Sequence, residues 1–170
     1  MLDYLTSPNC QISPDAFISS DARIHPSIRQ SKLTIGAFTQ IYDFAVIKFV
    51  GGNGDIEIGE HCYINTHCTL YSGNGIKLGN YVLIAPNTSL VPTNHSITRR
   101  DIEIRNQGFS NSRGGIVIED DVWIGANCVI LDGTIIRKGA VIGAGSIVKG
   151  EIEAYSINVG NPLIKIGERS

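Results

Sequence analysis

An aliphatic residue returns at every sixth position along most of this chain. The longest uninterrupted run is Ile118, Ile124, Ile130, Ile136, Ile142 and Val148. Runs with the same step begin earlier at Ile12, Ile35, Ile58 and Leu78. A period of six matches neither the helical repeat of about 3.6 residues nor the strand alternation of about two. It is typical of a solenoid, in which each six-residue unit contributes one short strand.

The aliphatic positions group in threes, which predicts about six coils of about 18 residues, each folded as a triangle of three strands. Extra residues fall after the third position of a coil, in segments 25–32, 48–55, 71–77 and 91–115. Every insertion should therefore leave from the same edge of a three-sided prism. The longest should protrude as a loop that carries His95, Arg99, Arg100 and Arg105. Its arginines fit either a solvated surface or contacts to phosphate.

Length and composition set further limits. The 170 residues suffice for one domain, 1–170, and residues 163–170 should cap the open solenoid end as a strand or short helix. A formal net charge of −2 provides no basic surface for nucleic acid. No apolar run reaches the roughly 18 residues that a membrane span needs. Residues 1–10 lack the basic start and long apolar stretch of a signal peptide, so we expect a cytoplasmic protein.

Small residues recur at two positions of the repeat. Cys62, Cys68 and Cys128 each lie four residues after a repeat aliphatic, where other coils have threonine, alanine, valine or serine. Free cysteine behaves as a small hydrophobe, so we predict that these thiols pack inside the column. Glycine often directly follows the aliphatic, as at Gly36 and Gly79. We attribute this glycine to the backbone freedom that tight corners need.

Two segments carry a family resemblance. Residues 116–126 read Ile-Val-Ile-Glu-Asp-Asp-Val-Trp-Ile-Gly-Ala, and residues 142–148 read Ile-Gly-Ala-Gly-Ser-Ile-Val. Together with the six-residue ladder, from about Ile56 to Lys165, they resemble the hexapeptide-repeat acyltransferases. The likeness is greatest to galactoside and maltose acetyltransferases and to O-acetyltransferases of bacterial surface polysaccharides. It implies an all-β fold, a left-handed parallel β-helix, whose hand the spacing itself does not show.

The resemblance also implies a reaction and a site. Enzymes of this kind transfer an acetyl group from acetyl-CoA to a sugar hydroxyl, need no metal, and act as homotrimers with active sites between subunits. His95, in Thr93-Asn94-His95 at the root of the protruding loop, corresponds to their general base. Asn65 corresponds to a residue that holds the acceptor, and Trp123 to one that packs beside the coenzyme. Backbone positions along the pantetheine arm correspond to Gly125, Ala126 and Ala144.

Two of these residues have simpler explanations that stay open. Asn65 also fits a corner position, because asparagine tolerates left-handed backbone. Trp123 also fits a cover for the prism edge or for a subunit interface, where tryptophan is common.

The chain departs from the family pattern in three places. Lys149 stands where the sugar acetyltransferases often have threonine, and Ile164 and Gly167 stand where they have arginine. We predict that Lys149 and Lys165 contact the coenzyme instead, with Arg169 as a substitute for the missing arginines. The N-terminal helical segment of the galactoside and maltose enzymes has no counterpart. The expected acceptor is therefore another sugar or nucleotide sugar, in surface polysaccharide biosynthesis.

Attack of a sugar hydroxyl on a thioester needs a base, and imidazole, with an ordinary pKa of about 6.5, suits that task. An N-acetyltransferase of an amino sugar is the nearest alternative, because a neutral amine also loses a proton during attack. A zinc protein resembling the γ-type carbonic anhydrases would need three histidines around one ion. His61 and His67, spaced by six, should lie on different faces and argue against it. A non-catalytic scaffold is the third alternative.

Overall fold

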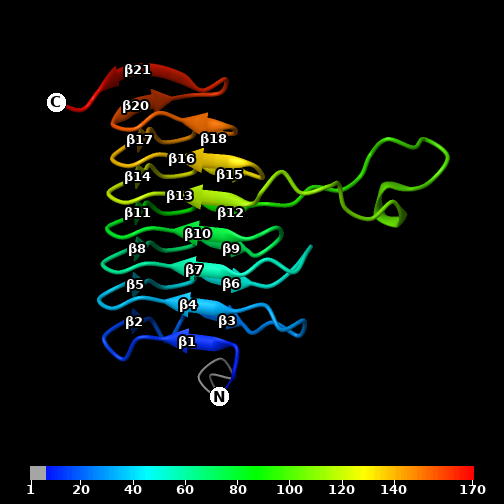
Figure 1. Ribbon diagram of the computed structural model, residues 1–170, viewed down its shortest axis with the longest axis horizontal. Helices are drawn as coiled ribbons and strands as arrows, with labels where there is room; N and C mark the ends of the chain where they lie inside the picture. The colour runs from blue at the N-terminus through cyan, green and yellow to red at the C-terminus, as the bar shows by residue number, and fades with distance from the viewer. Residues whose placement is uncertain (1–6) are drawn as a thin grey trace.

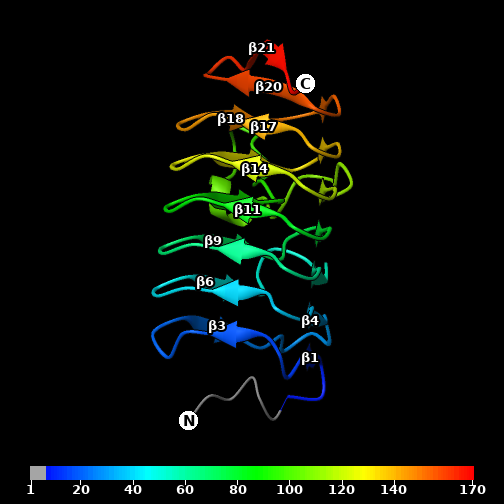
Figure 2. The same ribbon diagram turned by 90° about the vertical axis from the view of Figure 1, so that its left-hand side faces the viewer.

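The computed structural model describes residues 7–170. Residues 1–6, which hold most of the segment considered for a signal peptide, lie outside the described residues. The chain winds into a three-sided column of three sheets (Figure 1), with successive coils stacked one above another (Figure 2). All strand pairs in these sheets are parallel except the last, β20 with β21. The architecture is the left-handed parallel β-helix that the resemblance implied, and its six complete coils confirm the predicted number.

Each complete coil gives one strand to each of the three sheets. The first sheet contains β1 (Cys10–Ile12), β4 (Leu33–Ile35), β7 (Ile56–Ile58), β10 (Ile76–Leu78), β13 (Ile116–Ile118), β16 (Thr134–Ile136) and β19 (Glu151–Ile152). The second contains β2 (Phe17–Ile18), β5 (Gln40–Ile41), β8 (Tyr63–Ile64), β11 (Leu83–Ile84), β14 (Trp123–Ile124), β17 (Val141–Ile142), β20 (Ser156–Val159) and β21 (Ile164–Glu168). The third contains β3 (Arg23–His25), β6 (Val46–Lys48), β9 (Thr69–Tyr71), β12 (Ser89–Val91), β15 (Val129–Leu131) and β18 (Ile147–Val148).

The chain turns three times in each coil, and each turn builds one edge of the column. The first edge joins the first and second sheets, and the second edge joins the second and third sheets. The third edge joins the third sheet to the first sheet of the next coil.

Parallel pairing keeps equivalent side chains directly above one another in the core. Ile58, Leu78 and Ile118 pair in register along the first sheet, and none is more than 2% exposed. Each buried aliphatic side chain contributes about 1.5–3 kcal/mol, so these columns hold the coils together. The predicted inward cysteines are likewise buried, and burial raises the pKa of the Cys68 thiol to about 11.

The corner glycines have a different cause from the one expected. Gly36 and Gly79 do not adopt left-handed backbone, which falls two residues later, for example at Tyr81 with φ 59°. A Cβ atom on Gly36 would instead lie 2.6 Å from the carbonyl carbon of Gly59 in the next coil. Glycine at this position therefore permits the close approach of stacked backbones, not the turn itself.

All four insertions leave from the third edge, as predicted. The longest projects from one side of the column between β12 and β13 (Figure 1), and we call residues 92–115 the arm. It contains a short 3-10 helix, η2 (Ile104–Asn106).

The C-terminal end continues past the sixth coil through β19 and β20. Strand β21 then pairs antiparallel with β20, so the predicted cap is a strand. Within residues 7–170, no helix is long and apolar enough to cross a membrane.

Candidate active site

His95 lies near the start of the arm. The backbone of residues 108–110, where the arm returns toward the column, orients its ring. The imidazole Nδ1 lies 3.2 Å from the carbonyl oxygen of Gly108. A carbonyl oxygen only accepts hydrogen bonds, so Nδ1 carries the proton in the neutral ring and Nε2 keeps a free lone pair. The ring also packs against Phe109, with centroids 4.9 Å apart. The exposed imidazole is therefore held in the tautomer that a general base requires.

The two strands of the arm hold each other around this histidine. Residues 94–96 run antiparallel to residues 108–110, with an isolated bridge between His95 and Phe109. The Ser110 N–H donates to the carbonyl of Asn94 at 2.8 Å, and the Ser110 hydroxyl donates to the carbonyl of His95 at 3.0 Å. The position of the imidazole is thus tied to both strands of the arm.

Four of the predicted site residues follow the second edge. Asn65 comes directly after β8, and Gly125 and Ala126 come directly after β14. Ala144 occupies the same corner one coil further on, since Ile124 and Ile142 pair in register. The resulting edge runs parallel to the column axis. In the fifth and sixth coils this corner begins with small residues, Gly125-Ala126 and Gly143-Ala144.

Asn65 is not the left-handed residue of its corner. That conformation falls on His67, with φ 60°. The Asn65 amide donates instead to the carbonyl of Ile84 in the next coil at 2.9 Å. The corner explanation based on left-handed backbone is therefore wrong for Asn65, whereas its carbonyl Oδ1 has no donor among the hydrogen bonds of residues 7–170.

Trp123 lies on the outer surface of the second sheet and is 50% exposed. It stands in register between Leu83 and Val141, and together with Tyr81 and Arg169 these residues line a shallow hollow of about 290 Å³. A flat ring on such a surface can accept a ligand or a second protein chain.

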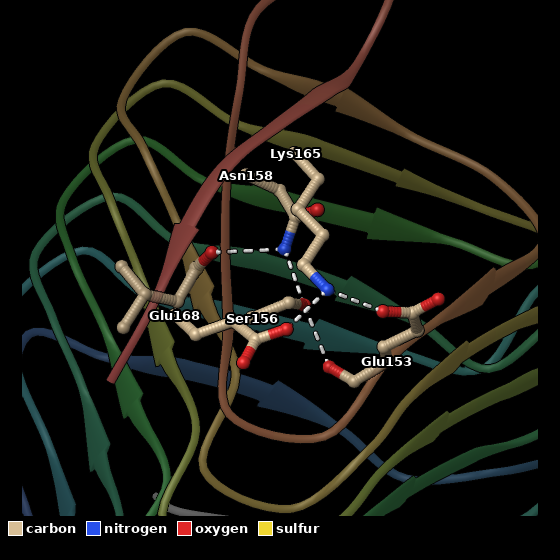
Figure 3. A network of polar contacts seen from close by, with 6 residues as sticks. Glu153, Ser156, Asn158, Lys165 and Glu168 are labelled. Atoms are coloured by element: carbon tan, nitrogen blue, oxygen red, sulfur yellow. Dashed lines mark hydrogen bonds and ion pairs between the residues drawn. The ribbon is translucent and has the colours of Figure 1, made fainter. Parts of the chain in front are cut away.

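Lys149 and Lys165 both line a cavity of about 520 Å³ at the C-terminal end of the column. Figure 3 shows the Lys165 ammonium donating to the carboxylates of Glu153 and Glu168, each at 2.6 Å. These hydrogen bonds raise the pKa of Lys165 and lower the pKa of Glu168. The charge of Lys165 is thus already balanced, while Lys149 is exposed at the third edge.

Arg169 is engaged in the same way. Its guanidinium donates to the carboxylate of Asp121 at 2.9 Å and to the carbonyl of Gly139 at 3.0 Å. The sequence did not predict the acidic partners Glu153 and Asp121, because they approach Lys165 and Arg169 only when the cap folds.

The other histidines are far from a shared centre. His61 stacks between Phe38 and Tyr81 at the first edge, with centroids 5.0 and 4.9 Å away. His67 stacks on Phe44 at the second edge. With His95 in the arm, the three imidazoles come from three different edges. Among residues 7–170, no group of three or more histidine, cysteine, aspartate or glutamate side chains could hold a metal ion.

Within one protomer, the candidate residues at the edges of the column form two groups, apart from Trp123 on the second sheet and Lys165 in the cap. Asn65, Gly125, Ala126 and Ala144 follow the second edge, and His95 and Lys149 belong to the third edge. The third sheet separates these two edges, so these candidate residues do not meet within one chain.

Comparisons with known proteins agree with this fold and with the repeat. Residues 115–150 match the family model described as bacterial transferase hexapeptide (six repeats). The chain is 31% identical over 141 residues to the dTDP-4-amino-4,6-dideoxy-D-glucose acyltransferase of Escherichia coli, covering 81% of this chain and 72% of that protein. The chain therefore belongs to the hexapeptide-repeat acyltransferase family, and the resemblance is confirmed.

Two further relatives show the range of the family. The galactoside O-acetyltransferase of Lactococcus lactis is 32% identical over 113 residues, covering 66% of this chain and 53% of that enzyme. The chain thus spans about half the length of that relative. A single-residue mutant of AntD, an N-acyltransferase from Bacillus cereus, solved with dTDP-4-amino-4,6-dideoxyglucose and coenzyme A, superposes with a TM-score of 0.80 at 25% identity. That alignment covers 100% of this chain and 90% of AntD.

Proposed function

We propose that this protein transfers an acetyl group from acetyl-CoA to a sugar or nucleotide sugar, with His95 as the general base. The observation that carries the proposal is the hydrogen bond from His95 Nδ1 to the Gly108 carbonyl, because it leaves Nε2 free to accept a proton. Family membership supplies the reaction class, and the arm supplies the base.

The reaction needs one proton to move twice. Nε2 of His95 takes the proton of the acceptor O–H or N–H while that oxygen or nitrogen bonds to the thioester carbonyl carbon. The tetrahedral oxyanion that forms then collapses, the carbon–sulfur bond breaks, and the thiolate of coenzyme A leaves. The imidazolium returns the proton to the sulfur, so no covalent enzyme intermediate is required.

The two halves of the site would meet between protomers. If the second edge of one protomer faces the third edge of the next, Asn65 stands opposite His95. Repetition of one head-to-tail contact closes into a ring, and the resemblance implies a ring of three. The homotrimer is therefore part of the proposal.

The small residues of the second edge suit the thin pantetheine chain of the coenzyme. Ala126 is half-buried and Ala144 is exposed, so this corner offers little more than methyl groups and backbone to a ligand. Trp123 offers a flat apolar surface on the neighbouring second sheet. Lys149 would contact a phosphate from the facing third edge. Lys165 would have to release Glu153 or Glu168 to do the same, so we assign it a weaker part.

The relatives are named for two kinds of acceptor. The galactoside relative is named for transfer to a hydroxyl, whereas the Escherichia coli relative is named for a dTDP-linked amino sugar. AntD, an N-acyltransferase, was solved with that same amino sugar nucleotide. N-acylation of an amino nucleotide sugar is accordingly the second candidate. It is favoured by the Escherichia coli relative, of which this chain covers 72%. Either reaction would serve surface polysaccharide biosynthesis in the cytoplasm.

The test is release of free thiol from acetyl-CoA in the presence of a panel of acceptors. The panel contains a galactoside, maltose, neutral nucleotide sugars and dTDP-4-amino-4,6-dideoxyglucose. Mass spectrometry of the product then distinguishes an ester from an amide. Stoichiometric zinc together with absence of acyl transfer would instead favour the carbonic anhydrase alternative.

A further inference from the structure

One buried carboxylate holds the returning root of the arm. Asp132 lies in the turn between β15 and β16 and is only 5% exposed. Its Oδ2 accepts from the N–H of Arg113 at 2.8 Å, and its Oδ1 accepts from the N–H of Gly115 at 3.0 Å. The last residues of the arm are thus bonded to the coil above it.

The outgoing root is held from the coil below. Asn74, in the turn between β9 and β10, donates its backbone N–H to the carbonyl of Pro92 at 3.0 Å. Its side-chain amide donates to Oδ2 of Asp132 at 3.1 Å. Asn74 and Asp132, which are 58 positions apart in sequence, therefore join both roots of the arm in one hydrogen-bonded unit. We call this pair the root clamp.

Glycine makes room for both roots. A Cβ atom on Gly73 would lie 2.6 Å from the carbonyl oxygen of Pro92, and one on Gly133 would lie 2.8 Å from Cβ of Arg113. Both glycines also have positive φ, of 43° and 80°. The roots therefore pass through spaces that only glycine leaves open, so their path has little freedom.

A short series of contacts leads from the root clamp to the imidazole. Only residues 111 and 112 separate Arg113 from Ser110, which bonds to Asn94 and to the His95 carbonyl. On the other side, two residues separate Pro92 from His95. A shift of either root would therefore move the base.

We propose that Asp132 and Asn74 are positioning residues that set where His95 stands, an inference that rests on the proposed function. A carboxylate is needed because all three groups that face Asp132 are donors. Asparagine in its place would turn an NH₂ group toward at least one of them. The isosteric D132N variant therefore loosens the arm without changing the size of the side chain.

The first measurement is amide hydrogen exchange, which needs no substrate. We expect exchange across the arm to be at least about tenfold faster in D132N, while the core strands β15 and β16 keep their protection. Asn74→Ala, which removes only the amide link, should act in the same direction with a smaller effect. D55N is the matched control, because Asp55 Oδ1 accepts from the N–H of Lys32 at 2.7 Å at the root of a different insertion. Unchanged arm exchange in D132N would overturn the root clamp.

The second measurement asks whether Asp132 acts through His95. With dTDP-4-amino-4,6-dideoxyglucose and acetyl-CoA as substrates, D132N should lower kcat at least about tenfold and leave the KM for acetyl-CoA within about twofold. In an H95A background the same change should lower the residual rate no further. An equal loss in both backgrounds would reduce Asp132 to a structural residue. Full turnover by H95A alone would remove the proposed function, and the exchange result would still decide the clamp.

Discussion

The imidazole of His95 donates from Nδ1 to the carbonyl oxygen of Gly108 at a distance of 3.2 Å. This contact fixes the tautomer by a backbone group, so the remaining nitrogen is available for proton transfer. No carboxylate contributes to the orientation of the ring among the hydrogen bonds of residues 7–170. The orientation of the proposed base therefore depends on the shape of the arm rather than on a second side chain.

Replacement of His95 by alanine should abolish most of the acetyl transfer and leave folding and coenzyme binding nearly unchanged. The side chain is exposed, so its removal creates no cavity in the column. General-base catalysis contributes about 10²–10⁴-fold, and kcat should fall by at least about 100-fold. Acetyl-CoA binding, measured by calorimetry, should stay within about twofold of the parent. H25A, which removes an exposed histidine from β3, is the control, and wild-type turnover in H95A would disprove the role.

Trp123→Ala should weaken acetyl-CoA binding more than acceptor binding. Loss of one aromatic contact of about 0.5–1.5 kcal/mol corresponds to a Kd for acetyl-CoA roughly two- to tenfold higher. Tyr63→Ala is the matched control, because Tyr63 lies on the same face two coils earlier, at 40% exposure. Calorimetric titration of both variants with acetyl-CoA compares them directly. Equal affinities in both variants would take Trp123 out of the coenzyme site.

The six-residue period was enough to predict the coils, the inward cysteines and the edge from which the arm leaves. Parallel in-register stacking makes the fold a repetition of local units, so a local pattern carries the architecture. Ile58, Leu78 and Ile118 illustrate this, because each recurs in sequence and stacks in space.

The six-residue pattern could not predict the contacts that orient the candidate site residues. The Gly108 carbonyl has no side-chain signature, and the partners of Lys165 come together only when β21 folds back onto β20. Asp132 reads in sequence as an ordinary turn residue before Gly133, although it is almost fully buried. The role of Gly36 was misjudged for a related reason, since the backbone that approaches it belongs to another coil.

The cap should loosen as pH falls. The pKa of Glu168 is lowered by Lys165, so its contribution is present above the ordinary pKa of a glutamate and is lost as pH falls through the lower folded value. The raised pKa of Lys165 adds a contribution that is complete below its ordinary value of 10.5 and disappears only at still higher pH. Between these limits the protection of β21 should be constant.

Lys165→Met tests this assignment, because it keeps the side chain long and removes its charge. Hydrogen exchange of β21 should then depend much less on acid than in the parent. Lys77→Met, which breaks the exposed pair with Glu57 on the first sheet, should leave β21 unchanged. An identical acid response of β21 in K165M and the parent would show that this ion-pair network does not hold the cap.

Subunits that are each inactive should restore activity when they are combined. If His95 of one protomer serves the Asn65 of the next, an H95A chain still offers an intact second edge, and an Asn65→Ala chain still offers an intact arm. Coexpression of the two variants in equal amounts should produce trimers in which about a quarter of the sites contain both native residues. Turnover should recover to about that fraction of the parent, whereas each variant alone stays near background.

Coexpression of H95A with D132N is the control. Both changes affect the arm, so every protomer carries either no base or a displaced one, and the recovery of turnover should be smaller. If the H95A and Asn65→Ala mixture gains nothing although native mass spectrometry of differently tagged chains shows mixed trimers, each site would lie within a single protomer, and the facing of second and third edges would have to be abandoned.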